Sequence, residues 1–317
     1  MASLVRVGGC DMASTVVHRR ADHDSGVDGR PGGMAGPAGT EALGVLEQAA
    51  RFAHDHGRTL TSGGSTWDYY RLGAGPVIVW LTGGTRRASL AFALLEDLSS
   101  DHTVVSVDYP PMRTIGEFVD ALDAIRAAEG VERCVLVGQS YGGFLAQAYV
   151  AARPEVVTQL VLSSSGPADY SRGWLPVEYL FIGLARVLPV RWVRKLLMRA
   201  VRRIVTAPEA DLASWQDAFR RTVDDLGRPD IVSHFAVPAD VMRRRLVTPA
   251  AFRTWSGHAA MLVARNDPTQ SPKDRKRLEA LLGRPVRLVD LGDRGHTALL
   301  ADPHGYSSLL RRALAPT

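Results

Sequence analysis

The alternation of short apolar runs with helical stretches is the feature that most restricts the fold of this 317-residue chain. Eight runs rich in β-branched and other apolar residues predict strands at 59–62, 67–71, 76–81, 103–107, 133–137, 157–163, 259–264 and 286–290. Helical stretches are expected at 41–56, 87–99, 115–129, 143–152, 271–283 and 305–315. Continuous apolar runs are typical of strands that are covered on both faces. The pattern therefore predicts an α/β protein with a doubly wound, mostly parallel sheet.

The alternation is interrupted once, over residues 171–253, which have the pattern of several helices and no strand. We interpret this segment as a helical lid, inserted in a core formed by residues 41–170 and 254–317. Open α/β sheets bind their ligands at the carboxyl edge of the strands, and the lid is expected to cover that edge. Residues 1–40 are rich in Gly, Ala, Asp and Arg without periodicity, and we expect a disordered N-terminal extension there.

Composition limits the classes of site and compartment. The two cysteines, Cys10 in a glycine-rich stretch and Cys134 at the start of an apolar run, favour free thiols in a reducing compartment. No histidine is spaced beside them as in a zinc site, and neither a metal nor an organic cofactor is expected. The N-terminus lacks the apolar stretch of a signal peptide, and the apolar stretch at 179–193 is interrupted by Arg and Pro. We therefore expect a cytoplasmic protein without a transmembrane segment.

The segment VLVGQSYGGF, residues 135–144, places the pattern G-x-S-x-G between an apolar strand and a helix. This is the context of a nucleophile elbow, in which a sharp strand-to-helix turn exposes the serine hydroxyl. Gly138 and Gly142 have no Cβ, so the helix can approach the strand closely. The pattern predicts that Ser140 is a nucleophile.

A serine hydroxyl needs a base to remove its proton, and in this arrangement the acid and then the histidine follow the serine along the chain. His296 comes just after the last predicted strand, whereas its closest rival, His258, precedes a strand and would lie at the opposite edge. Asp267, after the preceding strand, is the best candidate for the acid that orients the histidine, with Asp169 as the fallback.

Acyl transfer also needs donors for an oxyanion, usually two backbone amides. Tyr141 follows the nucleophile and supplies one amide, and Gly84, in the glycine-rich loop after the third predicted strand, is our choice for the other. Thr85 in the same loop, together with Trp174 and Tyr179 at the start of the helical insertion, are candidate substrate-binding residues.

These residues give residues 65–317 a resemblance to the α/β-hydrolase superfamily, in which elbow, acid and histidine occur in this order. The resemblance implies a serine hydrolase that cleaves an ester or thioester of a small or medium-sized acyl group through an acyl-enzyme. Relatives that act on haloalkanes or epoxides use aspartate at the elbow; this chain has Ser140 there, so neither activity is expected. The family commonly has His-Gly in the oxyanion loop, where this chain has Thr82 and Gly83.

The stretches at 104–111 and 138–157 most resemble the maspardin-like branch of the superfamily. Because some members of that branch are thought to be binding proteins, a non-catalytic binding protein is one alternative. A lyase or cyclase of a biosynthetic pathway, which would use His296 as a base without hydrolysis, is the other, since one fold hosts many functions.

The predicted lid contains a strongly basic helix. Seven basic residues and no acidic one lie between Glu178 and Glu209, and apolar residues from Val190 to Ile204 recur at helical spacing. Three interpretations stay open: a solvated face, a docking site for an acyl-carrier domain or other anionic partner, and an anionic membrane surface. No nucleic-acid recognition motif accompanies the charge, so nucleic acid is not an expected partner.

Overall fold

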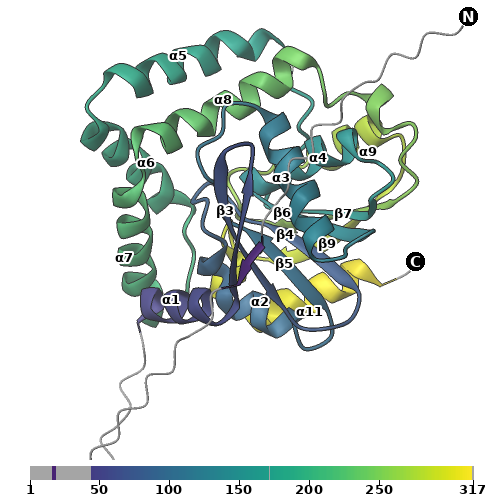
Figure 1. Ribbon diagram of the computed structural model, residues 1–317, viewed down its shortest axis with the longest axis horizontal. Coiled ribbons are helices and arrows are strands. Elements are labelled where there is room, and N and C mark those ends of the chain that lie inside the picture. The colour runs from purple at the N-terminus through teal and green to yellow at the C-terminus, as the bar shows by residue number, and fades with distance from the viewer. Residues whose placement is uncertain (1–15, 19–43, 171, 316–317) are drawn as a thin grey trace, which may run out of the picture.

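The computed structural model describes residues 16–18, 44–170 and 172–315, which form a nine-stranded sheet between layers of helices (Figure 1). The strands are β1 (Val16–His18), β2 (Gly57–Ser62), β3 (Ser65–Leu72), β4 (Val77–Leu81), β5 (Thr103–Val107), β6 (Cys134–Gln139), β7 (Val157–Ser163), β8 (His258–Ala264) and β9 (Val286–Gly292). Their order in the sheet is β1-β2-β3-β5-β4-β6-β7-β8-β9. Six strands are parallel to one another, namely β4, β5, β6, β7, β8 and β9. The strands β1, β2 and β3 extend the sheet with antiparallel pairs. The predicted fold class is confirmed.

Helices connect the strands and cover both faces of the sheet. They are α1 (Val45–His56), α2 (Phe92–Leu98), α3 (Ile115–Ala128), α4 (Tyr141–Ala152), α5 (Leu175–Val187), α6 (Val190–Ile204), α7 (Glu209–Asp225), α8 (Arg228–Arg244), α9 (Asp274–Leu282), α10 (Ala298–Ala301) and α11 (Pro303–Leu314). Short 3-10 turns lie at Ala88–Ala91, Arg172–Trp174 and Pro249–Phe252. No helix of the described residues is long and apolar enough to cross a bilayer.

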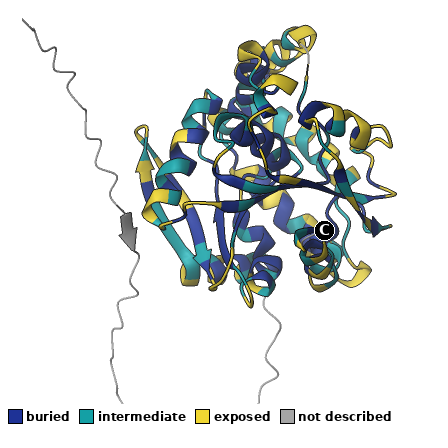
Figure 2. Ribbon diagram, turned by 90° about the vertical axis from the view of Figure 1, so that its right-hand side faces the viewer, coloured by how far each residue is buried: buried dark blue, intermediate teal, exposed yellow. Residues whose placement is uncertain are grey.

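The sheet separates two hydrophobic cores. On one face α3, α4 and α9 contribute Phe118, Leu145 and Leu278 to the first core. On the other face α1, α2 and α11 contribute side chains such as Phe52 and Leu310 to the second. Burial is concentrated along the sheet and the helix faces that contact it, whereas the outer helix faces are exposed (Figure 2). Burial on both faces explains why the central strands are continuous apolar runs.

Between β7 and β8 the chain forms the helices α5 to α8, as the helical pattern of this segment predicts. They pack in pairs, α5 against α8 and α6 against α7, and Ala185, Leu226 and Ile231 form a small core of their own. The predicted division into a core and a lid stays a prediction. Of residues 1–40 only Val16–His18 are described, where they pair with β2 as strand β1; the rest of that prediction lies outside the described residues.

The parallel strands bring four loops to one edge of the sheet. The loops after β4, β6, β8 and β9 begin at the carboxyl ends of their strands, and these ends lie on the same side because the strands share one direction. They carry Gly83, Ser140, Asp267 and His296 respectively. Residues more than 200 positions apart in the sequence thus come together at this edge.

Candidate active site

Ser140 lies at a strained turn between β6 and α4. Its backbone has φ 52° and ψ −118°, a conformation that few residues other than glycine adopt. A Cβ at Gly138 would lie 2.5 Å from the Gly143 Cα, and one at Gly142 would lie 2.2 Å from the Leu81 carbonyl oxygen. Both glycines are therefore required for the close contact between α4 and the neighbouring strands, and this contact holds the turn in place.

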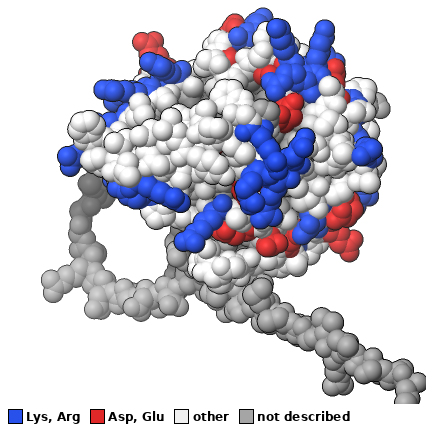
Figure 3. Space-filling model, turned by 90° about the horizontal axis from the view of Figure 1, so that it is seen from above, with Lys and Arg blue, Asp and Glu red and all other residues white. Residues whose placement is uncertain are grey.

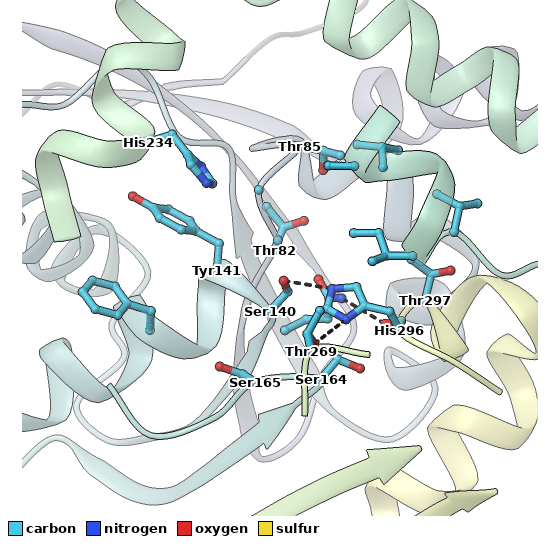
Figure 4. Close-up of a pocket in the computed structure, with 18 of the residues that line it drawn as sticks. Thr82, Thr85, Ser140, Tyr141, Ser164, Ser165, His234, Thr269, His296 and Thr297 are labelled. Atoms are coloured by element: carbon cyan, nitrogen blue, oxygen red, sulfur yellow. Dashed lines mark hydrogen bonds between the residues drawn. The ribbon is translucent and has the colours of Figure 1, made fainter. Parts of the chain in front are cut away.

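His296 connects Ser140 to Asp267. The His296 Nε2 lies 3.0 Å from the Ser140 Oγ, and the His296 Nδ1 lies 3.1 Å from both carboxylate oxygens of Asp267. An ionised carboxylate only accepts hydrogen bonds, so Nδ1 carries the proton and Nε2 is left as an acceptor for the serine hydroxyl. The structure thus brings together the three residues that the sequence predicts as nucleophile, base and acid. Figure 4 shows Ser140 and His296 of this group, with Thr269 beside them.

Thr269 is a contact of this group that the sequence analysis missed. Its backbone amide donates to the Asp267 Oδ1 at 2.9 Å, and its hydroxyl donates to the same oxygen at 2.7 Å. The Thr269 Oγ1 also lies 2.9 Å from the His296 Nδ1. A hydroxyl or amide two residues after an aspartate is typical of an Asx turn, and this signal could have identified the residue.

The Asp267 carboxylate is fully buried but stays ionised. Burial by itself would raise its pKa, but the hydrogen bond and charge of His296 and the two donors of Thr269 hold the pKa of Asp267 below its ordinary value. A buried anion beside the imidazole stabilises the imidazolium that forms whenever His296 accepts a proton.

Polar contacts fix the loops that carry the acid and the histidine. The Asn266 side chain accepts from the Gly295 amide at 2.8 Å and donates to the Asp293 carbonyl at 2.9 Å. Thr206, two residues after the end of α6, donates from its amide to the Thr297 hydroxyl at 2.7 Å. The loop that carries His296 is therefore hydrogen-bonded both to the loop that carries Asp267 and to the inserted segment.

Ser140 and His296 line a cavity of about 470 Å³, which is within the usual size of small-molecule sites. Most of its wall is apolar. The core contributes Trp80 and Leu299, and the inserted helices contribute Leu197, Val201 and Phe219. The helices α5 to α8 thus complete the cavity above the carboxyl edge of the sheet.

A second set of polar groups lines the cavity away from His296. The His234 ring stacks on the Tyr141 ring with centroids 4.6 Å apart (Figure 4). Burial, reinforced by the Arg86 charge, lowers the pKa of His234 to about 4, so that its imidazole is neutral at pH 7. Burial raises the pKa of Glu178 to about 7. Within the described residues, neither the Glu178 Oε2 nor the Tyr141 hydroxyl has a hydrogen-bond partner.

The loop after β4 is held by a buried arginine. Arg86 is 2% exposed, donates to the Tyr109 carbonyl at 3.0 Å and to the Ser233 hydroxyl at 3.1 Å, and also donates to the Pro110 carbonyl. Its guanidinium therefore joins this loop to the loop after β5 and to α8. A Cβ at Gly84 would lie 3.1 Å from the His234 Cε1, which places Gly84 against the second polar set.

The other candidate residues fall on both sides of the cavity wall. Thr85 lines the cavity. Trp174 and Tyr179 do not line it: they are 54% and 51% exposed, because the face of α5 that carries Glu178 and Ile182 points inward and leaves these two side chains on the outside. A role of these two residues in substrate binding stays a prediction.

The fallback acid Asp169 and the rival base His258 lie elsewhere. Asp169 pairs with Arg277 at 2.7 Å, and the exposed Asp293 pairs with Arg265 at 3.2 Å. His258 is at the amino end of β8, at the opposite edge of the sheet from Ser140. Among the residues that the structure describes, no group of three His, Cys, Asp or Glu side chains is placed to hold a metal ion.

Comparison with known proteins shows the family of the chain. The model of the alpha/beta hydrolase family matches residues 52–309, most of the chain. The chain belongs to the alpha/beta hydrolase family. No curated protein matches it.

Solved structures of other alpha/beta hydrolases share the fold. An esterase from Thermogutta terrifontis is 17% identical with a TM-score of 0.63, over 80% of this chain and 95% of that one. An enol-lactonase from Burkholderia xenovorans is also 17% identical with a TM-score of 0.63, over 81% of this chain and 99% of that one. A hydrolase from Pseudomonas aeruginosa, again 17% identical with a TM-score of 0.63, covers 81% and 97%. At these identities the likeness extends to the fold alone.

Proposed function

We propose that this alpha/beta hydrolase is a serine hydrolase that cleaves an ester or thioester of a small or medium-sized acyl group. The observation that carries the proposal is the continuous contact from Ser140 through His296 to Asp267 at the wall of a largely apolar cavity. The esterase and the enol-lactonase that share the fold act on ester bonds by their names, which agrees with this choice.

In the first step His296 accepts the Ser140 proton at Nε2 while the serine oxygen attacks the carbonyl carbon of the substrate. The Asp267 carboxylate stabilises the imidazolium that results. His296 then passes the proton to the departing alcohol or thiol, the bond between the acyl carbon and the leaving group breaks, and an acyl-enzyme stays on Ser140.

The oxyanion of each tetrahedral intermediate would accept hydrogen bonds from the Tyr141 and Gly84 amides. Tyr141 is the first residue of α4, where backbone amides have no acceptor within the helix and the helix dipole favours negative charge. Arg86 supports the other donor because it fixes the loop that contains Gly84. Backbone donors do this work, so Thr82 in place of the family's histidine is compatible with activity.

In the second step a water molecule gives a proton to His296 and attacks the acyl carbon. The bond between that carbon and the Ser140 Oγ then breaks, His296 returns the proton to the serine oxygen, and the carboxylic acid leaves. The apolar cavity wall accommodates a hydrocarbon acyl chain, and its volume fits small or medium-sized groups. We propose that residues 171–253 act as the lid, because Leu197, Val201 and Phe219 of these helices form part of the cavity wall.

The decisive test is covalent labelling with a fluorophosphonate probe, combined with release of p-nitrophenol from short acyl esters. The wild type should be labelled and active, and Ser140→Ala should lose both labelling and turnover. Ser164→Ala is the matched control: Ser164 lines the same cavity, and its Oγ has no hydrogen-bond partner within the described residues. This variant should keep its labelling.

A folded wild type that does not react with the probe would overturn the proposal, and so would equal labelling of Ser140→Ala. Circular dichroism on each variant separates lost chemistry from lost fold. Incorporation of labelled oxygen from water into the acid product distinguishes hydrolysis from a lyase or cyclase reaction.

A further inference from the structure

The outer surface of α5 and the first half of α6 exposes an unusual number of apolar side chains. Of the twelve large hydrophobic side chains that are exposed in the described residues, eleven lie between Tyr170 and Leu196. Val187 is 76% exposed, Trp192 62% and Leu196 60%. A large exposed patch of apolar side chains is typical of a surface that contacts a partner or a membrane.

Helical periodicity joins these side chains into one face. Along α5, Leu180, Leu184, Val187 and Leu188 follow one another at intervals of four, three and one residue, which places them on one side of the helix. Trp192 and Leu196 are four residues apart on α6 and continue the apolar surface past the turn at Pro189. Figure 1 shows α5 and α6 meeting at an outer corner of the molecule, away from the sheet.

Cationic side chains border this apolar surface. No acidic residue lies between Glu178 and Glu209. Seen from above, the uncharged surface is bordered by groups of Lys and Arg (Figure 3). Within the described part of the chain, the exposed basic residues of this segment form no ion pair; they are Arg186, Arg191, Lys195, Arg199, Arg202 and Arg203. Arginines elsewhere, such as Arg277 and Arg311, pair with aspartates.

Helix α6 also forms part of the cavity that Ser140 lines. On its inner side α6 presents Leu197, Val201 and Ile204 to the cavity that Ser140 lines, and on its outer side it exposes Trp192 and Leu196. A compound that is dissolved in an apolar phase against the outer side would have only one helix between it and the cavity.

We propose that the exposed side of α5 and α6, here called the α5–α6 face, docks on the surface of an anionic lipid bilayer. The face consists of the apolar residues Leu180, Leu184, Val187, Leu188, Trp192 and Leu196 with the basic residues Arg191, Lys195, Arg199 and Arg203. Apolar and aromatic side chains enter the boundary of headgroups and acyl chains, and the basic side chains stay at the anionic headgroups. The protein lies on the membrane without crossing it.

Two other partners for this face, a second copy of the chain and an acidic carrier domain, fit its side chains less well. A second copy of the chain would bring two sets of unpaired cations together, which is unfavourable across a symmetric contact. An acidic carrier domain would satisfy the cations but would leave the most exposed apolar residues, around the α5–α6 turn, without a matching partner. A bilayer supplies negative charge and an apolar phase at the same surface.

Co-sedimentation of the full chain with vesicles tests the docking. The wild type should bind vesicles of phosphatidylcholine with phosphatidylglycerol, bind pure phosphatidylcholine much more weakly, and lose binding as salt is raised. The variant with Arg191→Gln, Lys195→Gln and Arg199→Gln should bind anionic vesicles about a hundredfold more weakly, about fivefold for each charge. The variant with Trp192→Ala and Leu196→Ala should bind about tenfold more weakly.

Two controls match these variants. Arg133→Gln, Lys276→Gln and Arg312→Gln together remove the same charge from exposed positions outside the face, and should change binding by less than about twofold. Leu288→Ala removes the one exposed large hydrophobic side chain that the described residues carry outside 170–196, and should leave binding unchanged. Ser140→Ala should bind like the wild type, so docking is measured independently of the proposed hydrolysis.

Wild-type protein that stays in the supernatant with anionic vesicles would overturn the docking, as would equal losses in the charge variant and its control. Sedimentation equilibrium in the absence of lipid gives the remaining outcome. If the wild type forms a stable dimer and the variant with Trp192→Ala and Leu196→Ala is a monomer, the face serves self-association, and the proposal of membrane docking is overturned.

Discussion

The hydrolase core and the inserted helices place their charged and apolar side chains in opposite ways. In the core, charged groups at the site are buried and bonded: Asp267 accepts from His296 and Thr269, and Arg86 donates to two carbonyls of the loop after β5. In α5 and α6, basic side chains are exposed without ion pairs to the described residues, and apolar side chains such as Trp192 face solvent.

The difference separates what the fold needs from what a partner or substrate needs. Bonded buried groups hold reacting atoms in fixed positions, which acyl transfer requires. Exposed apolar and cationic side chains contribute little to the stability of the monomer, so their concentration is best explained by a contact outside the chain. Substitutions in the core should therefore change chemistry or folding strongly, and those in α5 should have smaller effects.

Asp267→Asn is expected to have the largest effect. The amide can donate to the His296 Nδ1 and so favour the tautomer that has its proton on Nε2, which cannot accept from Ser140. We expect kcat for p-nitrophenyl esters to fall about 10,000-fold with the fold intact. Asp293→Asn, at an exposed residue that pairs with Arg265, is the control and should stay close to wild type. Similar losses in both variants would remove Asp267 from the mechanism.

Gly142→Ala is expected to destabilise the core. The added Cβ would lie 2.2 Å from the Leu81 carbonyl oxygen and 2.5 Å from the Thr82 carbonyl oxygen, and backbone atoms cannot rotate away. We expect the free energy of unfolding, measured in urea, to fall by about 3 kcal/mol or more. A variant as stable as the wild type would show that α4 and β4 can separate without cost.

Strand positions and the turn that carries Ser140 could be predicted from sequence because each depends on neighbouring residues. The apolar run before Ser140 and the glycines around it define strand, turn and helix locally. Asp267 and His296 could be predicted because parallel strands deliver their loops to one edge whatever the length of chain between them. The helical nature of α6 followed from its apolar spacing in the same way.

Other features could not be predicted, because they depend on how a helix is rotated about its axis or on contacts between segments that are distant in the sequence. Periodicity predicts that α5 is a helix, but which of its faces points inward depends on α8, against which it packs. The sequence therefore did not indicate that Tyr179 is exposed or that Glu178 lines the cavity. Strand β1 is only three residues long and pairs with β2 across more than 35 residues, too short to give a pattern. The partners of Arg86 lie on two other segments, which no local signal indicates.

Glu178→Gln tests whether the buried carboxyl group of α5 makes the free energy of unfolding depend on pH. Burial raises the pKa of Glu178 from 4.5 to about 7, so from about pH 4.5 to 7 the native state retains a proton that the unfolded chain has lost. The free energy of unfolding of the wild type should therefore fall as pH rises through this range and change little above it, as far as this group is concerned. In Glu178→Gln that loss is absent.

The expected gain of Glu178→Gln over wild type is about 1–2 kcal/mol at pH 8 and close to zero at pH 4, a range reduced because the side chain is partly exposed. Urea unfolding at both pH values measures it. Glu132→Gln, an exposed carboxylate outside the inserted helices, is the control. A gain that is equal at both pH values would mean that packing, not ionisation, limits stability at this position.

Gly183→Ala should have the smallest effect and the opposite sign to Gly142→Ala. Gly183 lies in the interior of α5, and a Cβ there would meet no atom within 4 Å. Because alanine has less backbone freedom to lose, the substitution should stabilise the protein by about 0.5–1 kcal/mol, measured by urea unfolding. The same change of one hydrogen to one methyl group would then cost stability in the core and add it in the inserted helices. Loss of stability in Gly183→Ala would instead show that α5 packs more closely than its exposed surface indicates, and would weaken the contrast on which the docking proposal depends.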